Sequence, residues 1–158
     1  MHIRRIEDAD REAVAGLLRT RWAGPLIVTR GEAHVASALP GFIAEEGDRL
    51  VGVATLSRDG DALQVVSLDA VVAERGIGSA LLEAVLAEAR AQGLRRVWLC
   101  TTNDNLPALR FWQRRGFRLV AVHPGSVDRA RALKPQIPEV GHLGIPLRDE
   151  LELEVTLP

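Results

Sequence analysis

The sequence predicts a mixed α/β (α+β) fold organised around a mostly antiparallel sheet. Apolar segments at residues 42–45, 50–56 and 63–72 are separated by short turns that contain Asp and Gly, as tight reversals between antiparallel strands require. The last of these segments leads into a glycine turn, a helical pattern and a further apolar segment at residues 97–101. An antiparallel meander that continues as strand, turn, helix and strand is typical of a mixed fold.

The N-terminal segment predicts a strand followed by a helix. Two isoleucines at residues 3–6 indicate a short strand, and Asp8 or Asp10 can cap the helix that comes next. Residues 22–25, Trp-Ala-Gly-Pro, end that helix. The apolar residues 26–28 fit an additional strand, and the stretch from there to the first hairpin predicts no definite element.

The region after the glycine turn predicts two helices. The first begins near Ser79, shows apolar residues at helical spacing and stops at Gly93. The second begins near Asn105, which can cap it, and stops at Gly116. Residues 117–123 then form the next predicted strand.

A long connection at residues 124–149 separates that strand from the last one. It contains a short helical pattern at 126–133, followed by several prolines and glycines. Loops of this length within a domain are often lids or binding loops, and the alternative is a surface insertion. Residues 151–157 alternate between apolar and polar and predict a half-buried terminal strand.

Length and composition predict one domain over residues 1–158. The net charge of −1 gives no sign of a nucleic-acid or membrane partner. Cys100 is the only cysteine, so an internal disulfide is impossible and a reducing cytoplasm is the expected compartment. The N-terminus has no apolar signal region, and no apolar run approaches the ~20 residues of a membrane span.

The glycine turn has the chemistry of an anion site. Gly76 and Gly78 allow a ligand close to the backbone, and the first N–H groups of the helix are free to donate. Glycine turns of this length also occur as plain connections. A Walker loop is excluded because Ser79 and Ala80 follow the last glycine where a lysine is required, and a dinucleotide turn is disfavoured by Leu81.

Two blocks of sequence resemble the GNAT superfamily of acyl-CoA N-acyltransferases, most strongly over residues 60–123. Gly76-Ile77-Gly78 is similar to the second half of the family's pyrophosphate loop, written Arg/Gln-x-x-Gly-x-Gly/Ala, although Ala73 stands at the Arg/Gln position and Arg75 lies two residues on. The second block is similar to Asn-x-x-Ala-x-x-x-Tyr-x-x-x-Gly-Phe and runs from Asn105 through Ala108 to Gly116 and Phe117, with Trp112 in place of the tyrosine.

The resemblance implies a sheet of about six or seven strands with helices on both faces. It also implies acetyl-CoA as co-substrate, with the pantetheine arm in a gap between two parallel strands and the pyrophosphate on the glycine turn. No metal is expected, since the four histidines have no ligand spacing. The implied cofactor-binding residues are Val71, Val72, Arg75, Gly76, Ile77, Gly78, Ser79, Ala80, Asn105, Ala108 and Trp112.

Acetyl transfer to an amine needs a base that takes up the proton of the amine. Asp69 lies near the reacting end of its strand and is the candidate base; it can also be a surface carboxylate or a partner of Arg75. In relatives that acetylate protein N-termini a glutamate stands where this chain has Cys100, which we expect to be a packed core thiol. Reserve candidates are Glu45, His123, Asp128, Glu139, His142 and Asp149.

The resemblance implies a tyrosine as the general acid that protonates the departing thiolate, and this chain has no tyrosine. Trp112 takes the family tyrosine's position but cannot donate a proton at neutral pH. We therefore expect an N-acetyltransferase that moves an acetyl group from acetyl-CoA directly to a primary amine of a small molecule or peptide. The alternative is an acyl-CoA-binding module, a sensor or subunit with little turnover. Pairing of the terminal strand, or of its edge, with a second copy would give a homodimer.

Overall fold

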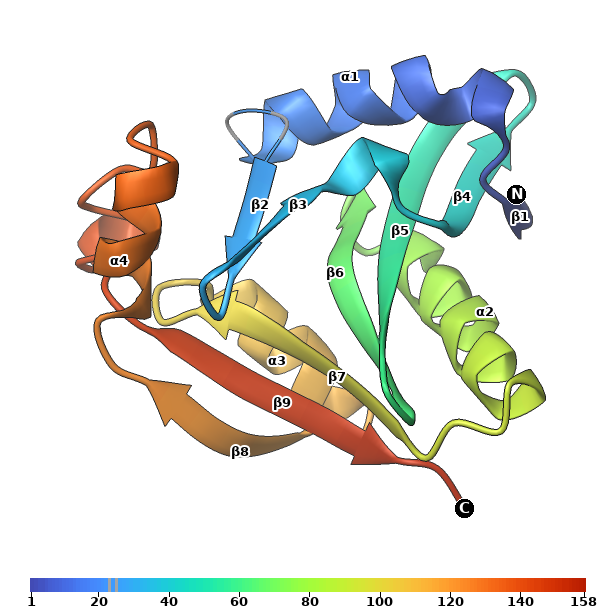
Figure 1. The fold of residues 1–158 in the computed structure, drawn as a ribbon. Coiled ribbons are helices and arrows are strands. Elements are labelled where there is room, and N and C mark those ends of the chain that lie inside the picture. The colour runs from blue at the N-terminus through green and yellow to red at the C-terminus, as the bar shows by residue number, and fades with distance from the viewer. Residues whose placement is uncertain (23, 25) are drawn as a thin grey trace.

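The computed structural model describes residues 1–22, 24 and 26–158 (Figure 1). The N-terminal half contains β1 (His2–Arg5), a 3₁₀ turn (Asp8–Asp10), α1 (Arg11–Trp22), β2 (Leu26–Thr29), β3 (Glu32–Val35), a 3₁₀ turn (Ala36–Ala38), β4 (Gly41–Glu46), β5 (Arg49–Asp59) and β6 (Ala62–Ala70). The C-terminal half contains α2 (Ile77–Ala91), β7 (Arg96–Thr102), α3 (Leu106–Arg114), β8 (Arg118–His123), α4 (Ser126–Leu133), a 3₁₀ turn (His142–Gly144) and β9 (Glu150–Thr156).

Seven strands form one sheet in the order β1-β4-β5-β6-β7-β9-β8. Neighbouring strands are antiparallel except for β6 and β7, which are parallel and are joined by α2. The predicted fold class, a mixed and mostly antiparallel sheet of six or seven strands, is confirmed. β8 forms one edge of the sheet and β1 the other.

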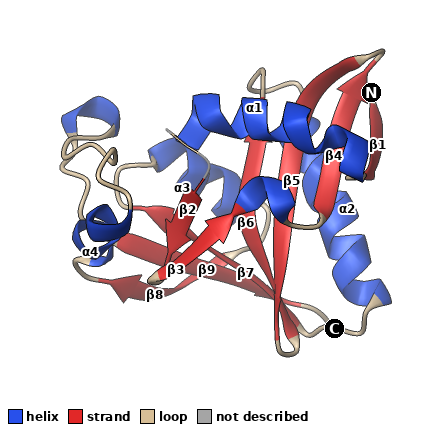
Figure 2. Ribbon diagram, turned by 45° about the horizontal axis from the view of Figure 1, so that its top comes forward, coloured by secondary structure: helices blue, strands red, loops and turns tan. Residues whose placement is uncertain are grey.

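Helices cover both faces of the sheet, as expected (Figure 2). Side chains of β5 alternate between two apolar clusters. Val53 packs with Val14 and Leu18 of α1, whereas Ala54 packs with α2 and α3 on the opposite face. No helix in the described part of the chain is long and apolar enough to cross a membrane.

A close contact between β5 and α2 fixes the position of the glycine turn. A Cβ atom at Gly52 would lie 2.6 Å from Cγ2 of Ile77, the first residue of α2. Ile77 is itself only 1% exposed. Because only glycine leaves room there, the start of α2 is held against the sheet at the level where β6 ends.

The parallel strands β6 and β7 separate soon after they meet. Their pairing is confined to Ala62–Gln64 on β6 and Arg96–Trp98 on β7, although β6 continues to Ala70 and β7 to Thr102. A bulge in the β5–β6 pairing, between Thr55 and Leu56, lies where the two strands begin to part. The strand ends therefore leave a slot in the middle of the sheet.

The region between α1 and β4 differs from the sequence prediction. The predicted strand at 26–28 is present as β2, but it pairs with β3 as a separate two-stranded hairpin over the sheet rather than joining it (Figures 1 and 2). The stretch without a predicted element thus contains β3. Of the predicted helix break at 22–25, residues 23 and 25 lie outside the described part of the chain.

Several predicted boundaries shift by one to three residues. The strand predicted at 63–72 ends at Ala70, and the helix predicted from Ser79 already begins at Ile77. Asp8 and Asp10 form a 3₁₀ turn directly before α1. Glu7 is the N-cap residue of that turn, and Asp10 accepts a hydrogen bond from the backbone N–H of Glu7.

The long connection at 124–149 is tied to the rest of the molecule. The side chain of Asn103 accepts hydrogen bonds from the backbone N–H groups of Arg148 and Asp149 in this connection. Buried Asp104 accepts a hydrogen bond from the N–H of His142. At the other end Lys134, only 4% exposed, donates from Nζ to the carbonyls of Trp22 and Leu26. These contacts place the connection and α4 beside β2.

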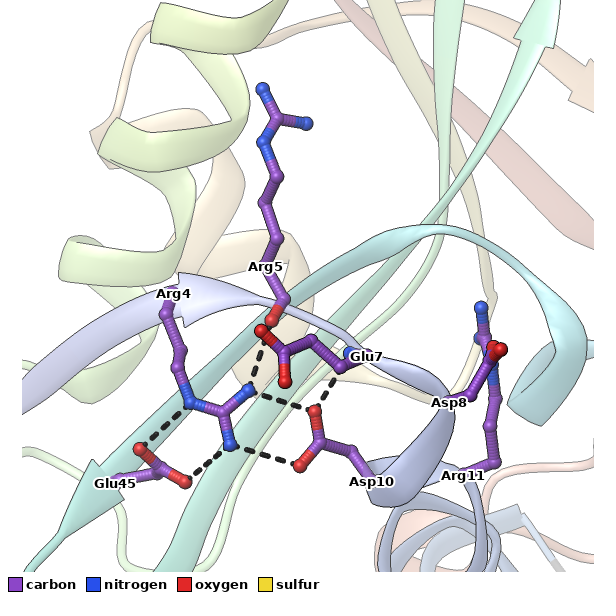
Figure 3. A network of polar contacts seen from close by, with 7 residues as sticks. All are labelled: Arg4, Arg5, Glu7, Asp8, Asp10, Arg11 and Glu45. Carbon is purple, nitrogen blue, oxygen red and sulfur yellow. Dashed lines mark hydrogen bonds and ion pairs between the residues drawn. The ribbon is translucent and has the colours of Figure 1, made fainter.

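A network of charged side chains joins β1 to β4 and to the 3₁₀ turn before α1 (Figure 3). The guanidinium of Arg4 contacts Asp10 at 2.8 Å and Glu45 at 2.7 Å. Hydrogen bonds from Arg4, followed by one from the backbone of Glu7, lower the pKa of Asp10 to about 2. The network lies at the β1 edge of the sheet, so it stabilises the fold away from the slot between β6 and β7.

Candidate active site

A groove of about 470 Å³ lies between the end of β6, the glycine turn and α3. It lies on the α2–α3 side of the sheet, at the slot where β6 and β7 part. Its floor is apolar and its rim includes three arginines. The lining residues are Leu68, Ala70, Val72, Ala73, Glu74, Gly76, Ile77, Gly78, Ser79, Asn105, Pro107, Ala108, Arg110, Phe111, Trp112, Arg114 and Arg115.

The glycine turn presents the N-terminus of α2 to this groove. Gly76 is the N-cap residue and has φ 77° and ψ 3°, a left-handed conformation that suits glycine. A Cβ atom at Gly78 would lie 3.0 Å from the ring of Phe111 on α3. The two glycines thus serve different purposes: Gly76 permits the turn, and Gly78 permits α3 to approach α2.

The positive charge at the start of α2 comes from Arg115, the C-cap residue of α3, rather than from the glycine turn. Arg115 donates from Nη2 to Oγ of Ser79 at 2.6 Å, and its Cζ atom lies 3.7 Å from the centroid of the Phe111 ring. Arg75 instead pairs with Glu46 at 2.8 Å and is not among the lining residues. Arg115 is not among the residues predicted from the sequence, although the Arg-Arg pair directly before Gly116 indicates positive charge there.

Of Val71 and Val72, which we expected to bind the pantetheine arm, only Val72 lines the groove. The N–H of Val71 donates to the carbonyl of Val51 at 2.8 Å, and its carbonyl accepts from Arg21 at 3.0 Å. Val72 lines the groove, and so does Ala70. Both backbone groups of Val71 therefore have partners within the protein, and the residue lies outside the groove lining.

The residues predicted on α3 come together at the groove. Asn105 is the N-cap of α3 and accepts from the N–H of Ala108 at 3.2 Å. Trp112 is 5% exposed and meets Phe111 and Phe117 edge to face, at centroid distances of 5.0 and 4.9 Å. The indole thus lines the groove from within an aromatic cluster.

Asp69 lies at the end of β6 on the opposite face of the sheet, which α1 and the β2–β3 hairpin cover. Its Oδ2 accepts a hydrogen bond from the indole N–H of Trp22 at 2.8 Å. Burial raises the pKa of the carboxyl above its usual value, while the contact with Trp22 and the charge of Arg21 oppose the shift. A half-buried carboxyl with a raised pKa at the edge of the slot has the properties of a general base.

Cys100 is not a packed core thiol, contrary to expectation. It lies on the polar face of β7 with His123 and Glu152, and the ligand atoms of these three residues are within 4.8 Å of one another. Burial and the nearby glutamates raise the pKa of the thiol to about 12, so it is a poor nucleophile. Arg30 and Arg96 contact the carboxylate of Glu152, which weakens its attraction for a cation.

The remaining candidates for the base are dispersed. Glu45 belongs to the network at the far edge of the sheet. His123 contacts Glu152 at 3.0 Å. The others lie in the connection before β9: Asp128 pairs with Arg131, Glu139 and His142 are exposed, and Asp149 accepts a hydrogen bond from the N–H of Gly125.

Comparison with known proteins identifies relatives over most of the chain. Residues 11–117 match the model of the Acetyltransferase (GNAT) family. The chain is 40% identical over 131 residues to the uncharacterized protein YdhI of Bacillus subtilis, and the aligned region covers 82% of each chain. It is 38% identical over 104 residues to a mycothiol acetyltransferase of Clavibacter michiganensis, covering 60% of this chain and 34% of that protein.

The fold has the same kind of relatives among solved structures. An acetyltransferase from Bacillus subtilis in complex with CoA superimposes with a TM-score of 0.71 at 18% identity, covering 99% of both chains. The architecture therefore agrees with the family model, and the glycine turn and the α3 block lie on the two sides of one groove. The chain belongs to the GNAT family of acetyltransferases.

Proposed function

We propose that the protein is an N-acetyltransferase that moves an acetyl group from acetyl-CoA directly to a primary amine. The observation that carries this proposal is the groove at the slot between β6 and β7, with the N-terminus of α2 at its rim. A helix N-terminus attracts phosphate oxygens, and an apolar slot accepts an extended chain. The two parts of CoA, a pyrophosphate and a long pantetheine arm, match these two features.

The phosphates bind to the N–H groups of the turn and of the first residues of α2, from Arg75 to Ala80. Arg115 supplies the counter-charge, since its guanidinium already contacts Ser79 at the helix start. Arg110 and Arg114 add positive charge along the same rim. The arm then runs past Asn105, Ala108 and Trp112 on one side and Ala70 on the other.

Chemistry takes place where the slot connects the two faces of the sheet. The amine reaches the thioester from the face that carries Asp69, and the carboxylate takes up its proton through a direct contact or one water. A backbone N–H at the end of β6 stabilises the oxyanion of the tetrahedral intermediate. The CoA thiolate leaves without a protein acid, because a thiol of pKa about 8.5 is a tolerable leaving group.

Relatives support this assignment and leave the acceptor open. The Clavibacter relative is named for acetylation of mycothiol, and a structural neighbour from Brucella melitensis is named a ribosomal-protein-alanine N-acetyltransferase. Small molecules and peptides are thus both acceptors within the wider family. The protein acts as a single domain over residues 1–158, in the cytoplasm.

The rival is a module that binds acyl-CoA without turnover. Trp112 favours this rival, because the family position for the acid holds a side chain that cannot donate a proton at neutral pH. Release of free CoA in the presence of an amine decides between the two, since a binding module leaves the thioester intact.

The first experiment is calorimetric titration of the protein with acetyl-CoA. We compare the parent with Gly76→Glu and with Gly60→Glu as matched control. Both glycines have positive φ, 77° and 60°, and open space at the Cβ position, but Gly60 lies in the β5–β6 turn, away from the groove. Binding near micromolar in the parent and the control, and its loss in Gly76→Glu, supports the proposal. Absence of binding by the folded parent contradicts both the enzyme and the module.

The edge strand β8 is the candidate site for a homodimer. Leu119, Val120 and Val122 are 50%, 46% and 58% exposed there, which is unusual for an edge strand of a monomer. Light scattering coupled to gel filtration measures the mass, and a Val122→Lys variant that changes a dimer to a monomer supports pairing through β8. A parent of 17.2 kDa contradicts it.

A further inference from the structure

Three side chains of the types that bind transition metals meet on neighbouring strands of the sheet. They are Cys100 on β7, His123 on β8 and Glu152 on β9, and their ligand atoms all lie within 4.8 Å of one another. Glu152 pairs with Cys100 on one side and with Ala121, two residues before His123, on the other. Because alternate residues of a strand share a face, this register places the three side chains on the same face. The register of the sheet, and not spacing along the chain, assembles the cluster.

The distances within the cluster suit one small metal ion. Bonds of about 2.0–2.3 Å from a tetrahedral zinc ion place its ligand atoms about 3.3–3.6 Å apart. Nε2 of His123 lies 3.0 Å from Oε1 of Glu152. The side chain of His123 is 29% exposed, whereas that of Glu152 is 9% exposed. An ion can therefore enter from the side of His123 and reach a carboxylate that is largely shielded from water.

The charges around the cluster allow a cation. Arg96 and Arg30 both contact the carboxylate of Glu152, at 2.6 and 3.4 Å. The carboxylate of Glu150, opposite His123, is only 4% exposed and, within the described residues, accepts hydrogen bonds from a serine hydroxyl and a backbone N–H. Neither of these two donors carries a charge. The negative charge of this buried carboxylate offsets the repulsion that the arginines exert on a cation.

The ligands have the outer contacts that metal sites use. Arg96 donates to Oε2 of Glu152, whereas Oε1 faces His123. The guanidinium thus holds one carboxylate oxygen, and the other oxygen can bind an ion. The hydroxyl of Thr29 forms a hydrogen bond with Cys100. Contacts of this kind orient the ligands of metal sites.

We propose that Cys100, His123 and Glu152 bind one Zn²⁺ ion, with a water molecule as the fourth ligand. A thiolate, an imidazole and a carboxylate together select zinc over magnesium or calcium, which prefer oxygen ligands. As the ion binds, the thiol proton and the proton between Nε2 and Oε1 pass to solvent. The ion ties the edge strand β8 to β9 and β7. The site lies on the face of the sheet opposite the acetyl-CoA groove, so the inference goes beyond the proposed acetyl transfer and does not depend on it.

The experiment is a titration of the full chain, prepared without a histidine tag, with cobalt(II) chloride, followed by displacement with zinc chloride. Co²⁺ accepts the same ligands as Zn²⁺ and absorbs light, which makes its binding visible. A thiolate-to-cobalt charge-transfer band in the near ultraviolet reports Cys100 alone, since the chain has no other cysteine. We expect one ion per chain, the appearance of this band, and its loss when zinc is added. Absence of binding, or binding without the band, overturns the inference.

Two variants test the ligands. Cys100→Ser and His123→Gln should each weaken zinc binding at least about tenfold, and both should lose the rise in Tm that zinc gives the parent. His142→Gln, which replaces an exposed histidine in the 3₁₀ turn before β9, is the matched control and should bind as the parent does. If Cys100→Ser does not fold, His123→Gln on the edge strand carries the same test. Equal zinc affinity in the parent and all variants means an adventitious ion only and overturns the inference.

Discussion

The indole N–H of Trp22 donates a hydrogen bond to Oδ2 of Asp69 at 2.8 Å, joining the last residue of α1 to the end of β6. The contact holds the carboxyl in one orientation at the slot. Because the donor is neutral, it does not cancel the effect of burial, and the pKa of Asp69 stays above its usual value. The proposed base is thus positioned by α1, a helix that does not line the groove.

Replacement of Asp69 by Asn should lower kcat/KM for the amine by roughly 10²–10⁴-fold, the usual contribution of a general base. The Trp22 hydrogen bond can persist, because the amide oxygen still accepts. In the parent, kcat/KM should decline as pH falls through the raised pKa of Asp69, and the variant should lose that limb. A pH–rate profile with the same acidic limb in both proteins would exclude Asp69 as the base.

The carboxylate of Asp69 should lower the stability of the folded protein at neutral pH, although it should raise activity there. Its folded pKa lies above the unfolded value of 3.8, so its favourable contribution is present below pH 3.8 and is lost as pH rises through the folded pKa. Asp69→Asn should therefore unfold at a higher temperature than the parent at pH 7, and the gap should narrow in acid. An equal Tm difference at all pH values would contradict this.

Arg115→Ala should weaken acetyl-CoA binding about tenfold, because its guanidinium lies at the helix start beside Ser79. Arg75→Ala should change the Kd much less, since Arg75 pairs with Glu46 outside the groove lining. Titration calorimetry at two salt concentrations measures the Kd for acetyl-CoA of both variants. The Kd of the Arg115 variant should depend less on salt than the Kd of the parent. The opposite ranking would mean that Arg75 leaves Glu46 for the cofactor.

Trp112→Tyr should raise kcat roughly tenfold by supplying a hydroxyl at the position of the missing acid. Trp112→Phe is its control, because it removes the same indole without adding a hydroxyl. Both variants should lower Tm, since Trp112 is packed between Phe111 and Phe117. Equal kcat values for the two variants would show that departure of the thiolate needs no acid from this position.

Arg4→Met should lower the Tm near neutral pH through the loss of the contacts with Asp10 and Glu45. The pKa of Asp10 is depressed to about 2, so the stability it contributes is present above its ordinary pKa of 3.8 and is lost as pH falls through about 2. The Tm difference between parent and variant should shrink over that range in thermal scans. Activity should be unaffected, because the network lies at the far edge of the sheet.

The sequence was sufficient for the parts of the site that depend on local chemistry. Gly76 and Gly78 predicted a tight turn before a helix, because glycine lets the backbone turn sharply and lets other atoms come close to it. Asn105 predicted the N-cap of α3, because an Asn side chain can accept a hydrogen bond from a free N–H at the start of a helix. The antiparallel meander of β4, β5 and β6 followed from apolar periodicity and turn residues, which are also local, whereas the place of β9 between β7 and β8 was not predicted.

What the sequence did not show depends on contacts between distant segments. The strand β3 and its pairing with β2 were missed because Glu32–Val35 has only four residues and no run of apolar side chains. Cys100 looked like a core thiol because Trp98 and Leu99 precede it, yet alternation along β7 turns it toward Glu152 on β9. Arg75 lies near the glycine turn in sequence and Arg115 lies near it in space. The structure distinguishes them, because Arg75 pairs with Glu46 and Arg115 contacts Ser79.

Lys134 is the only lysine in the chain, and its amine is buried against two backbone carbonyls. Acetyl-CoA slowly acylates accessible lysine side chains without any enzyme, and arginine does not react in this way. A protein that keeps a reactive thioester in its groove for every turnover thus offers no lysine nucleophile on its own surface. Its nineteen arginines keep their charge in the presence of the acyl donor.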